Sequence, residues 1–300
     1  MELWIPITIG AATAQTLRFM LQKRLKGMAL STAGATFARF IYSSPLVAVI
    51  AMIYATTTGQ GAPEIPAAFW PYALAGGTSQ ILATMCVVAL FSHRNFAVGI
   101  TFKKSEVLLS ALFGFVILGD RFTTLTILAM LIGLAGVLLL SDPPGGIGPW
   151  HQRIFNRATA LGLGAGVLFG ISGNGYRGAS LSLAEGDVFY RAIVTLALVT
   201  AFQTIAMAVW LAWRERGEMA RVLASWRVAG LVGITSMVGS IFWFSAFTLQ
   251  NAAYVNAVGQ IELLFSLLIG AFVFGEKVTG REWQGLSLLT LSIIMLVLLI

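Results

Sequence analysis

Almost the whole sequence divides into apolar segments that are long enough to cross a lipid bilayer, with short polar stretches between them. The segments lie near residues 3–22, 33–55, 70–92, 96–118, 122–141, 158–182, 187–212, 228–249, 253–274 and 281–300. A membrane-spanning helix needs about 20 mostly apolar residues. Only 10% of the residues are charged, against about 25% in a soluble domain, so most of the chain needs lipid as its solvent. We therefore expect an all-α membrane protein with ten transmembrane helices.

The positive charges follow the pattern of a membrane protein. The net charge is +7, but the basic residues lie in short loops between apolar segments, which sets orientation in a bilayer and gives no reason to expect nucleic-acid binding. They concentrate in the odd-numbered loops, which places those loops in the cytoplasm and both termini outside. The first apolar segment is too long for the core of a signal peptide. We expect a multi-pass protein of a bacterial inner membrane, with the lipid bilayer as its surroundings.

An internal repeat gives the domain organisation. At an offset of 156 residues, positions 106–123 and 262–279 share seven identities, and Glu106 falls on Glu262. Asp120-Arg121 falls on Glu276-Lys277, so an acidic–basic pair occurs in both copies. We expect residues 1–141 and 158–300 to be two five-helix repeats joined by a linker at 142–157. Because five is odd, the second repeat must enter the membrane from the opposite side, as in many secondary transporters.

These motifs resemble a known family. Gly119-Asp120-Arg121 and Gly275-Glu276-Lys277, each before a last apolar helix, are similar to the turns of EamA-type transporters in the drug/metabolite transporter superfamily. Ala38-Arg39-Phe40 also matches their pattern. The sequence departs from many relatives at Val107 and Leu263, where they have proline, and in its two lysines at 103 and 104. The resemblance implies ten helices and metabolite transport, often export.

Ionisable residues within the apolar segments are the first candidates for function, because each costs roughly 2.5–3.5 kcal/mol to insert. Lys103 and Glu106 are three residues apart, so they share one helix face and can neutralise each other. The repeat supplies Gln260 and Glu262, and the two glutamates should face each other across the pseudo-two-fold axis. The functional interpretation is a central cavity whose lysines bind an anionic group and whose glutamates bind an ammonium group or a proton. The structural interpretation is a buried Lys103–Glu106 pair, with Lys104 extended to the membrane surface.

Other polar residues are candidates for the cavity wall. Gln15, Arg18 and Gln22 form one stripe of the first segment, which cannot face lipid. Arg18 fits either a ligand carboxylate or an ion pair with one of the glutamates. The glycine-rich sixth segment favours a bent or broken helix that exposes Asn174 and Tyr176, or plain close helix packing. The remaining candidates are Gln80 and Trp243, each with ordinary packing as the alternative.

We interpret a few further residues as structural. Arg39 and Arg191 open the second and seventh segments and read as anchors at the membrane surface. Asp120-Arg121 and Glu276-Lys277 read as helix caps that close tight turns. The single cysteine, Cys86, lies in an apolar segment and reads as packing.

The sequence favours a secondary active transporter that exports an amino acid or a related zwitterion or anion through a central cavity by alternating access. Protons are a candidate coupling ion. A carrier for a cationic or lipid-linked compound is the first alternative, and a non-transport membrane protein is the second. We expect no cofactor, because the sequence has no phosphate-binding GxxxxGK[ST] motif. An enzyme would need a nucleophile, metal ligands or a histidine–acid pair in its apolar segments, and the sequence offers none. We expect a monomer or a weak dimer.

Overall fold

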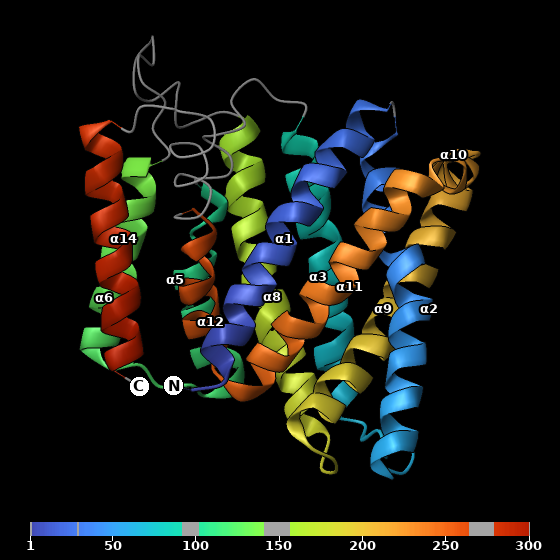
Figure 1. The fold of residues 1–300 in the computed structure, drawn as a ribbon, viewed down its shortest axis with the longest axis horizontal. Helices are drawn as coiled ribbons and strands as arrows, with labels where there is room; N and C mark the ends of the chain where they lie inside the picture. Colours follow the sequence, from blue (N-terminus) through green and yellow to red (C-terminus); the bar gives the residue numbers. More distant parts are fainter. Residues whose placement is uncertain (1, 29, 92–101, 141–156, 264–278, 300) are drawn as a thin grey trace.

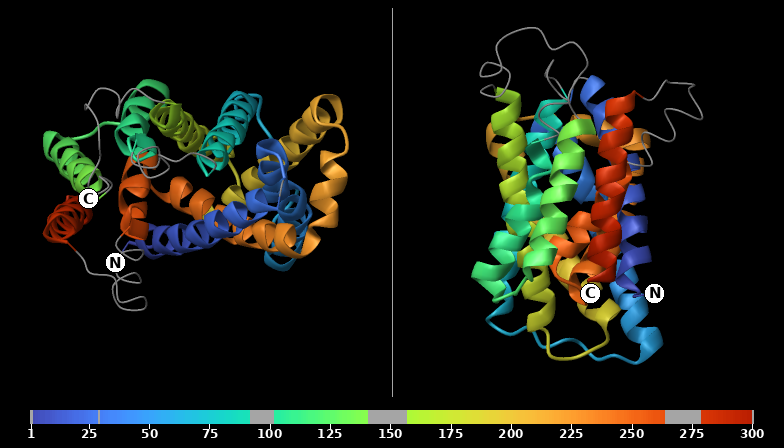
Figure 2. Two further views of the ribbon diagram at one scale, coloured as in Figure 1. Left: turned by 90° about the horizontal axis from the view of Figure 1, so that it is seen from above. Right: turned by 90° about the vertical axis from the view of Figure 1, so that its left-hand side faces the viewer.

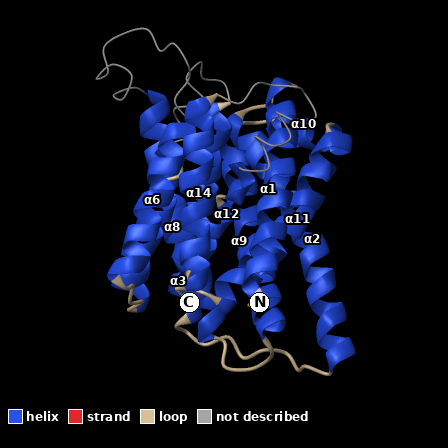
Figure 3. Cartoon of the chain, turned by 60° about the vertical axis from the view of Figure 1, so that its left-hand side comes forward, coloured by secondary structure: helices blue, strands red, loops and turns tan. Residues whose placement is uncertain are grey.

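The computed structural model describes residues 2–28, 30–91, 102–140, 157–263 and 279–299, and every regular element among them is a helix (Figure 3). In chain order the helices are α1 (Trp4–Gly27), α2 (Thr32–Thr58), α3 (Phe69–Leu90), α5 (Glu106–Phe113), η1 (Gly114–Leu118), α6 (Thr124–Leu140), α8 (Arg157–Ser182), α9 (Val188–Arg214), α10 (Glu218–Ala224), α11 (Trp226–Leu249), α12 (Ala252–Gly259) and α14 (Gly280–Leu298). Most of these bounds lie within a few residues of the expected apolar segments. The expected segments 96–118 and 253–274 contain the shorter helices α5, η1 and α12 instead, and the short α10 was not expected.

The long helices run side by side, and both ends of the chain lie at the same end of the bundle (Figure 1). Among the described residues, four helices are long and apolar enough to cross a membrane: α2, α3, α9 and α11. The helices α1 and α8 have similar lengths but carry more polar residues, and α6 and α14 are shorter apolar helices. Large apolar side chains are exposed on the outer faces of the bundle, as a lipid environment requires.

The helices α6 and α14 pack against each other at one edge of the bundle (Figure 2). Gly136 allows this close approach, because a Cβ atom there would lie 2.8 Å from the Gly285 carbonyl oxygen. The Ser292 hydroxyl adds a hydrogen bond of 2.6 Å to the Ala129 carbonyl oxygen. The two helices form a separate layer beside α5 and α12 (Figure 2).

The glycine-rich α8 is one continuous helix, so the expectation of a broken sixth segment is wrong. The alternative, close packing, is confirmed. A Cβ atom on Gly175 would lie 2.8 Å from the Gly76 Cα atom of α3. On the α5 side, a Cβ atom on Gly166 would lie 3.0 Å from the Lys103 carbonyl oxygen. The absence of side chains lets α8 approach both neighbours closely.

The helical breaks lie in the fourth and ninth apolar segments instead. A turn at Lys104–Ser105 precedes α5, and a turn at Gln260 follows α12. The Val107 amide donates to the Lys104 carbonyl oxygen at 3.5 Å, and the Leu263 amide donates to the Gln260 carbonyl oxygen at 2.9 Å. Positions 104 and 260 are 156 residues apart, so both breaks fall at the same point of the sequence repeat.

The residues after η1 form a tight turn, as the sequence analysis expected for Asp120-Arg121. Gly119 has a positive φ of 71°, which glycine adopts without strain, and the Asp120 amide donates to the Gly114 carbonyl oxygen at 3.1 Å. Asp120 pairs with Arg177 of α8 at 2.9 Å, so its ion-pair partner is not its sequence neighbour. The corresponding residues Glu276 and Lys277 lie outside the described residues, as does nearly all of the expected linker 142–157.

Candidate functional site

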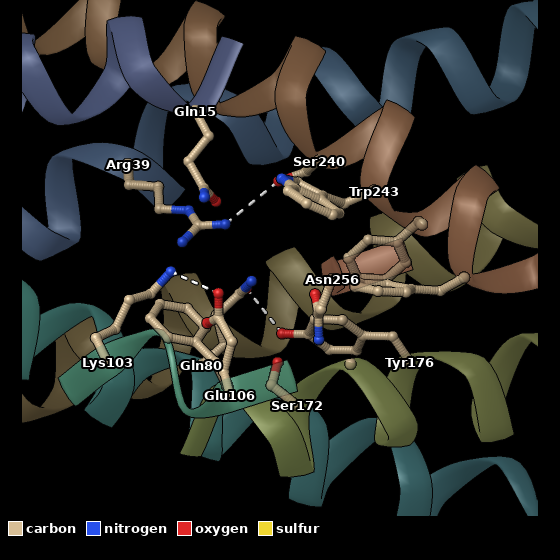
Figure 4. A pocket seen from close by; sticks show the side chains of 14 residues that line it. Gln15, Arg39, Gln80, Lys103, Glu106, Ser172, Tyr176, Ser240, Trp243 and Asn256 are labelled. Carbon is tan, nitrogen blue, oxygen red and sulfur yellow. Dashed lines mark hydrogen bonds and ion pairs between the residues drawn. The ribbon is translucent and has the colours of Figure 1, made fainter. Parts of the chain in front are cut away.

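A small polar cavity lies in the centre of the bundle, between helices that come from both halves of the chain (Figure 4). The described residues that line it are Gln15, Arg39, Gln80, Lys103, Glu106, Phe169, Ser172, Gly173, Tyr176, Ser240, Trp243, Phe244, Phe247 and Asn256. Its volume is about 40 Å³. One water molecule needs about 10–15 Å³ of such space, so this conformation admits water but not a metabolite.

The sequence candidates separate into two groups. Six of them line the cavity: Gln15, Gln80, Lys103, Glu106, Tyr176 and Trp243. The other five lie outside its wall: Arg18, Lys104, Asn174, Gln260 and Glu262. Three of those five, Arg18, Lys104 and Glu262, are charged and belong to the polar surroundings of the cavity.

Lys103 and Glu106 form a buried ion pair in the cavity wall. The Lys103 Nζ atom lies 2.9 Å from the Glu106 Oε1 atom, as the three-residue spacing predicts. The ammonium group also lies 4.9 Å from the centre of the Phe169 ring, within the range of a cation–π contact. The two opposite charges therefore compensate each other inside the bundle.

Lys104, which is buried, forms a second ion pair with Glu262, which is partly buried. Lys104 is only 3% exposed, so the interpretation that it extends to the membrane surface is wrong. Gln15 and Lys103 also contribute to the electrostatic surroundings of Glu262. On the other side, Lys104 and Gln260 line a smaller cavity against α6 and α14.

Arg18 is buried, and its stripe faces the interior as expected. Its guanidinium donates to the Gln22 side-chain oxygen at 3.0 Å and to the Gln15 side-chain oxygen at 3.4 Å. The Gln22 amide continues to the Ala35 carbonyl oxygen on α2 at 3.3 Å. Within the described part of the chain, no carboxylate lies within ion-pair distance of Arg18, although Glu262 is close enough to act on it electrostatically.

Tyr176 and Gln80 are held by a residue that the sequence analysis missed, Gln203. The Tyr176 hydroxyl donates to the Gln80 Oε1 atom at 2.7 Å. The Gln203 amide nitrogen lies 3.0 Å from the same oxygen and 3.0 Å from the Gly77 carbonyl oxygen. The Tyr176 ring stacks on Phe244, with 4.1 Å between the ring centres. This network fixes the cavity wall to α3, α9 and α11.

Asn174 does not reach the cavity, contrary to the interpretation that α8 would expose it there. Its amide nitrogen donates to the Ser110 carbonyl oxygen of α5 and to the Gly170 carbonyl oxygen, both at 2.9 Å. The residue is completely buried. It therefore fastens α5 to α8, directly beside the cavity wall.

Trp243 lines the cavity with a buried donor. Its ring stacks on Phe247, with 5.6 Å between the ring centres, and Gly259 leaves space for the indole. Among the described residues the indole N–H has no hydrogen-bond acceptor. A buried N–H without an acceptor costs free energy, which a bound ligand can recover.

Arg39 is the largest error of the sequence analysis, because it is not a surface anchor. It is 3% exposed and lines the cavity. Its Nε, Nη1 and Nη2 atoms donate to Ser236 at 2.9 Å, Thr84 at 3.1 Å and Ser240 at 3.4 Å. The signal that could have found it is the pair Ser236 and Ser240, which lie one helical turn apart in an apolar segment.

With this geometry in place, the second half of the chain can be assigned. Residues 157–298 match the model of the EamA-like transporter family. The second half of the chain is therefore similar to the EamA-like transporter family. EamA-like proteins are transporters, and the chain is accordingly an integral, multi-pass membrane protein.

The fold of this EamA-like chain is also known from a solved crystal structure. That protein is 16% identical and aligns with a TM-score of 0.66, over 98% of this chain and 99% of its own length. At this identity the likeness shows the fold alone. A search of curated proteins gives no match.

Proposed function

We propose that this EamA-like chain is a secondary active transporter that moves a small polar metabolite through the central cavity by alternating access. The observation that carries the proposal is the cavity itself, whose wall contains Arg39, Lys103 and Glu106. Charged groups at membrane depth are expensive and typically mark a substrate or ion pathway. A scaffold would gain nothing from placing three of them around a water-sized space.

We further propose that the chain crosses the membrane ten times, as inverted repeats at 1–141 and 158–300. Both chain ends lie at one end of the bundle (Figure 1), which agrees with an even number of crossings. The matched helical breaks at Lys104 and Gln260 add a structural parallel to the sequence repeat. Discontinuous helices that meet near the midplane are how many transporters build their binding sites.

Transport through this site requires a wider conformation, because about 40 Å³ is too small for a metabolite. The Lys104–Glu262 ion pair joins α5's side of the cavity to the segment after α12. Rocking of one repeat against the other would open the cavity to one side of the membrane and strain this pair. We propose that the pair breaks and re-forms during each transport cycle.

The charges of the site favour an amino acid or a related zwitterion or anion as the substrate. Lys104 is buried rather than extended to the surface, and Arg39 adds a further positive charge to the cavity wall. Both observations disfavour a purely cationic substrate. Glu106 and Glu262 are the groups through which protons would couple to export across a bacterial inner membrane.

Flux in proteoliposomes tests the proposal. Vesicles are loaded with a mixture of the twenty amino acids and common dicarboxylates, and release is followed by mass spectrometry with and without a proton gradient. We expect release of a subset of these compounds that protein-free vesicles retain. Release no faster than from protein-free vesicles, under both gradients, would refute transport of this substrate class.

A further inference from the structure

The central cavity has one cation that no carboxylate compensates. Lys103 pairs with Glu106, and Lys104 pairs with Glu262. Arg39 is equally buried, but in the described part of the chain its guanidinium donates hydrogen bonds only to the hydroxyl groups of Thr84, Ser236 and Ser240. Hydroxyl groups accept hydrogen bonds but carry no charge, so the cavity wall keeps two positive charges against one negative charge.

The guanidinium group of Arg39 is held in a fixed position. Ser236 and Ser240 on α11 bind its Nε and Nη2 atoms, and Thr84 on α3 binds its Nη1 atom. An arginine has five N–H donors in a planar fork, so three are used here and two remain. A planar carboxylate matches such a fork with two parallel hydrogen bonds.

A second unused donor lines the same cavity. The indole N–H of Trp243 is buried and has no acceptor among the described residues. Figure 4 shows Arg39, Ser240 and Trp243 along one side of the cavity, across from Lys103, Gln80 and Glu106. One side of the cavity thus offers donors without acceptors, while the other holds a neutralised ion pair.

We propose that Arg39 is the anion-binding residue of this cavity and that it binds a carboxylate group of the transported metabolite, with Trp243 as a second donor. The inference rests on the proposed function. It differs from a role of the lysines, because Lys103 and Lys104 already have carboxylate partners. A buried cation without a counter-charge is costly, and the carboxylate of the substrate supplies that charge only while it is bound.

Matched acids and amides test this inference. Proteoliposomes are loaded with equal concentrations of phenylalanine and phenylalaninamide, threonine and threoninamide, and succinate and succinamide. Release is measured by mass spectrometry and corrected for protein-free vesicles. We expect the wild type to release at least one acid at least tenfold faster than its amide. In Arg39→Gln, release of that acid should fall at least tenfold, to the rate of its amide, while Arg39→Lys keeps part of the preference.

Arg214→Gln is the matched control, because Arg214 lies exposed in the last turn of α9, away from the cavity. It removes the same charge and should leave the acid preference unchanged. Trp243→Phe keeps an aromatic ring but removes the indole N–H, and should lower the preference less than Arg39→Gln does.

The outcomes separate the inference from the function beneath it. No release by the wild type of these compounds, or of any compound in the mixture of twenty amino acids and dicarboxylates, overturns both. Release without a preference for the acids, or an equal loss of acid and amide release in Arg39→Gln, overturns the inference and leaves the transport function standing. If Arg39→Gln does not fold, two other measurements decide: the ratio of acid to amide release by the wild type, and release by Trp243→Phe. The proposal is refuted if the wild type shows no preference for the acids and Trp243→Phe releases them at the wild-type rate.

Discussion

Lys104 and Glu262 form an ion pair between two segments that are 158 residues apart in the sequence. Each residue lies at or beside a helical break, the first at the turn before α5 and the second just after the turn at Gln260. Helical breaks leave backbone groups without their usual partners, so these two points are natural positions for hinge motion. The ion pair therefore joins two helical breaks of the described residues.

The first prediction concerns the strength of this pair. Lys104→Met or Glu262→Gln alone leaves one buried charge without its partner, which typically costs about 3–5 kcal/mol. The double variant removes both charges and should recover most of the loss in apparent unfolding temperature, measured in detergent by differential scanning fluorimetry. Additive losses in the double variant would show that the two side chains do not act as a pair.

The second prediction concerns Glu106. Glu106→Gln removes the partner of Lys103 and a candidate proton-binding group, while the amide keeps a similar size and hydrogen-bonding capacity. We expect transport in proteoliposomes to fall at least tenfold, with normal membrane insertion and a single peak in size-exclusion chromatography. Glu185→Gln is the control, because Glu185 lies exposed between α8 and α9. Normal transport by Glu106→Gln would remove this carboxylate from the mechanism.

The third prediction tests the close contact of α3 and α8. In Gly175→Ala the new methyl group would lie 2.8 Å from both the Gly76 Cα atom and the Tyr72 carbonyl oxygen. Backbone cannot move aside as a side chain can, so we expect a destabilisation of about 1–3 kcal/mol. Gly164→Ala in the same helix meets no atom within 4 Å and should be neutral or stabilising by up to about 1 kcal/mol. Equal unfolding temperatures for the two variants would contradict the packing.

Much of this architecture could be predicted from the sequence, because membrane helices need long apolar segments whatever their neighbours are. The three-residue spacing of Lys103 and Glu106 also predicted their ion pair, although the turn at Lys104–Ser105 lies between them. Local rules of this kind need no knowledge of the tertiary arrangement. They predicted the approximate bounds of the long helices, the stripe of Gln15 and Arg18, and part of the cavity wall.

The errors arose where partners are distant in the sequence. Arg39 lies near the start of its segment, and an isolated arginine there is typical of a surface anchor. Only the fold brings Thr84 and Ser236 to it. The spacing of the glycines in α8 was equally compatible with a helical break and with close packing. The close contact of Gly175 with Gly76 of α3 shows that the glycines serve packing. The prediction that Asn174 faces the cavity was wrong for the same reason. Its amide nitrogen donates to the carbonyl oxygen of Ser110, a residue 64 positions away in the sequence.

The fourth prediction concerns pH and the start of α9. Asp187 caps this helix, accepting from the Tyr190 amide, the Tyr54 hydroxyl and the Gln60 side chain, each at 2.8 Å. Partial burial alone would raise the pKa of Asp187, but these hydrogen bonds outweigh it and hold the pKa below its usual value. A lowered pKa in the folded state means that the ionised carboxylate stabilises the fold above the unfolded pKa of about 3.9.

That stabilisation should disappear as the pH falls through the lowered pKa of Asp187. At pH 7 we expect Asp187→Ala to be about 1 kcal/mol less stable than the wild type, because the helix cap is lost. This appears as a lower unfolding temperature, and the difference between the two proteins should shrink in acid. Asp187→Asn keeps the cap but cannot titrate, so its difference from the wild type should be smaller at pH 7. A difference between wild type and Asp187→Ala that grows toward low pH would contradict the assignment.

The last prediction concerns orientation in the membrane. The buried Glu218 carboxylate accepts a hydrogen bond of 2.6 Å from the Ser31 amide, so the turn after α1 and the short α10 lie at the same end of the bundle. Basic residues gather at this end, which predicts that it lies in the cytoplasm. In a Cys86→Ala background, Gly27→Cys and Ala220→Cys should react with a membrane-impermeant maleimide only after the cells are opened. Ala184→Cys, between α8 and α9, should react in intact spheroplasts, and the reverse labelling pattern would invert the proposed topology.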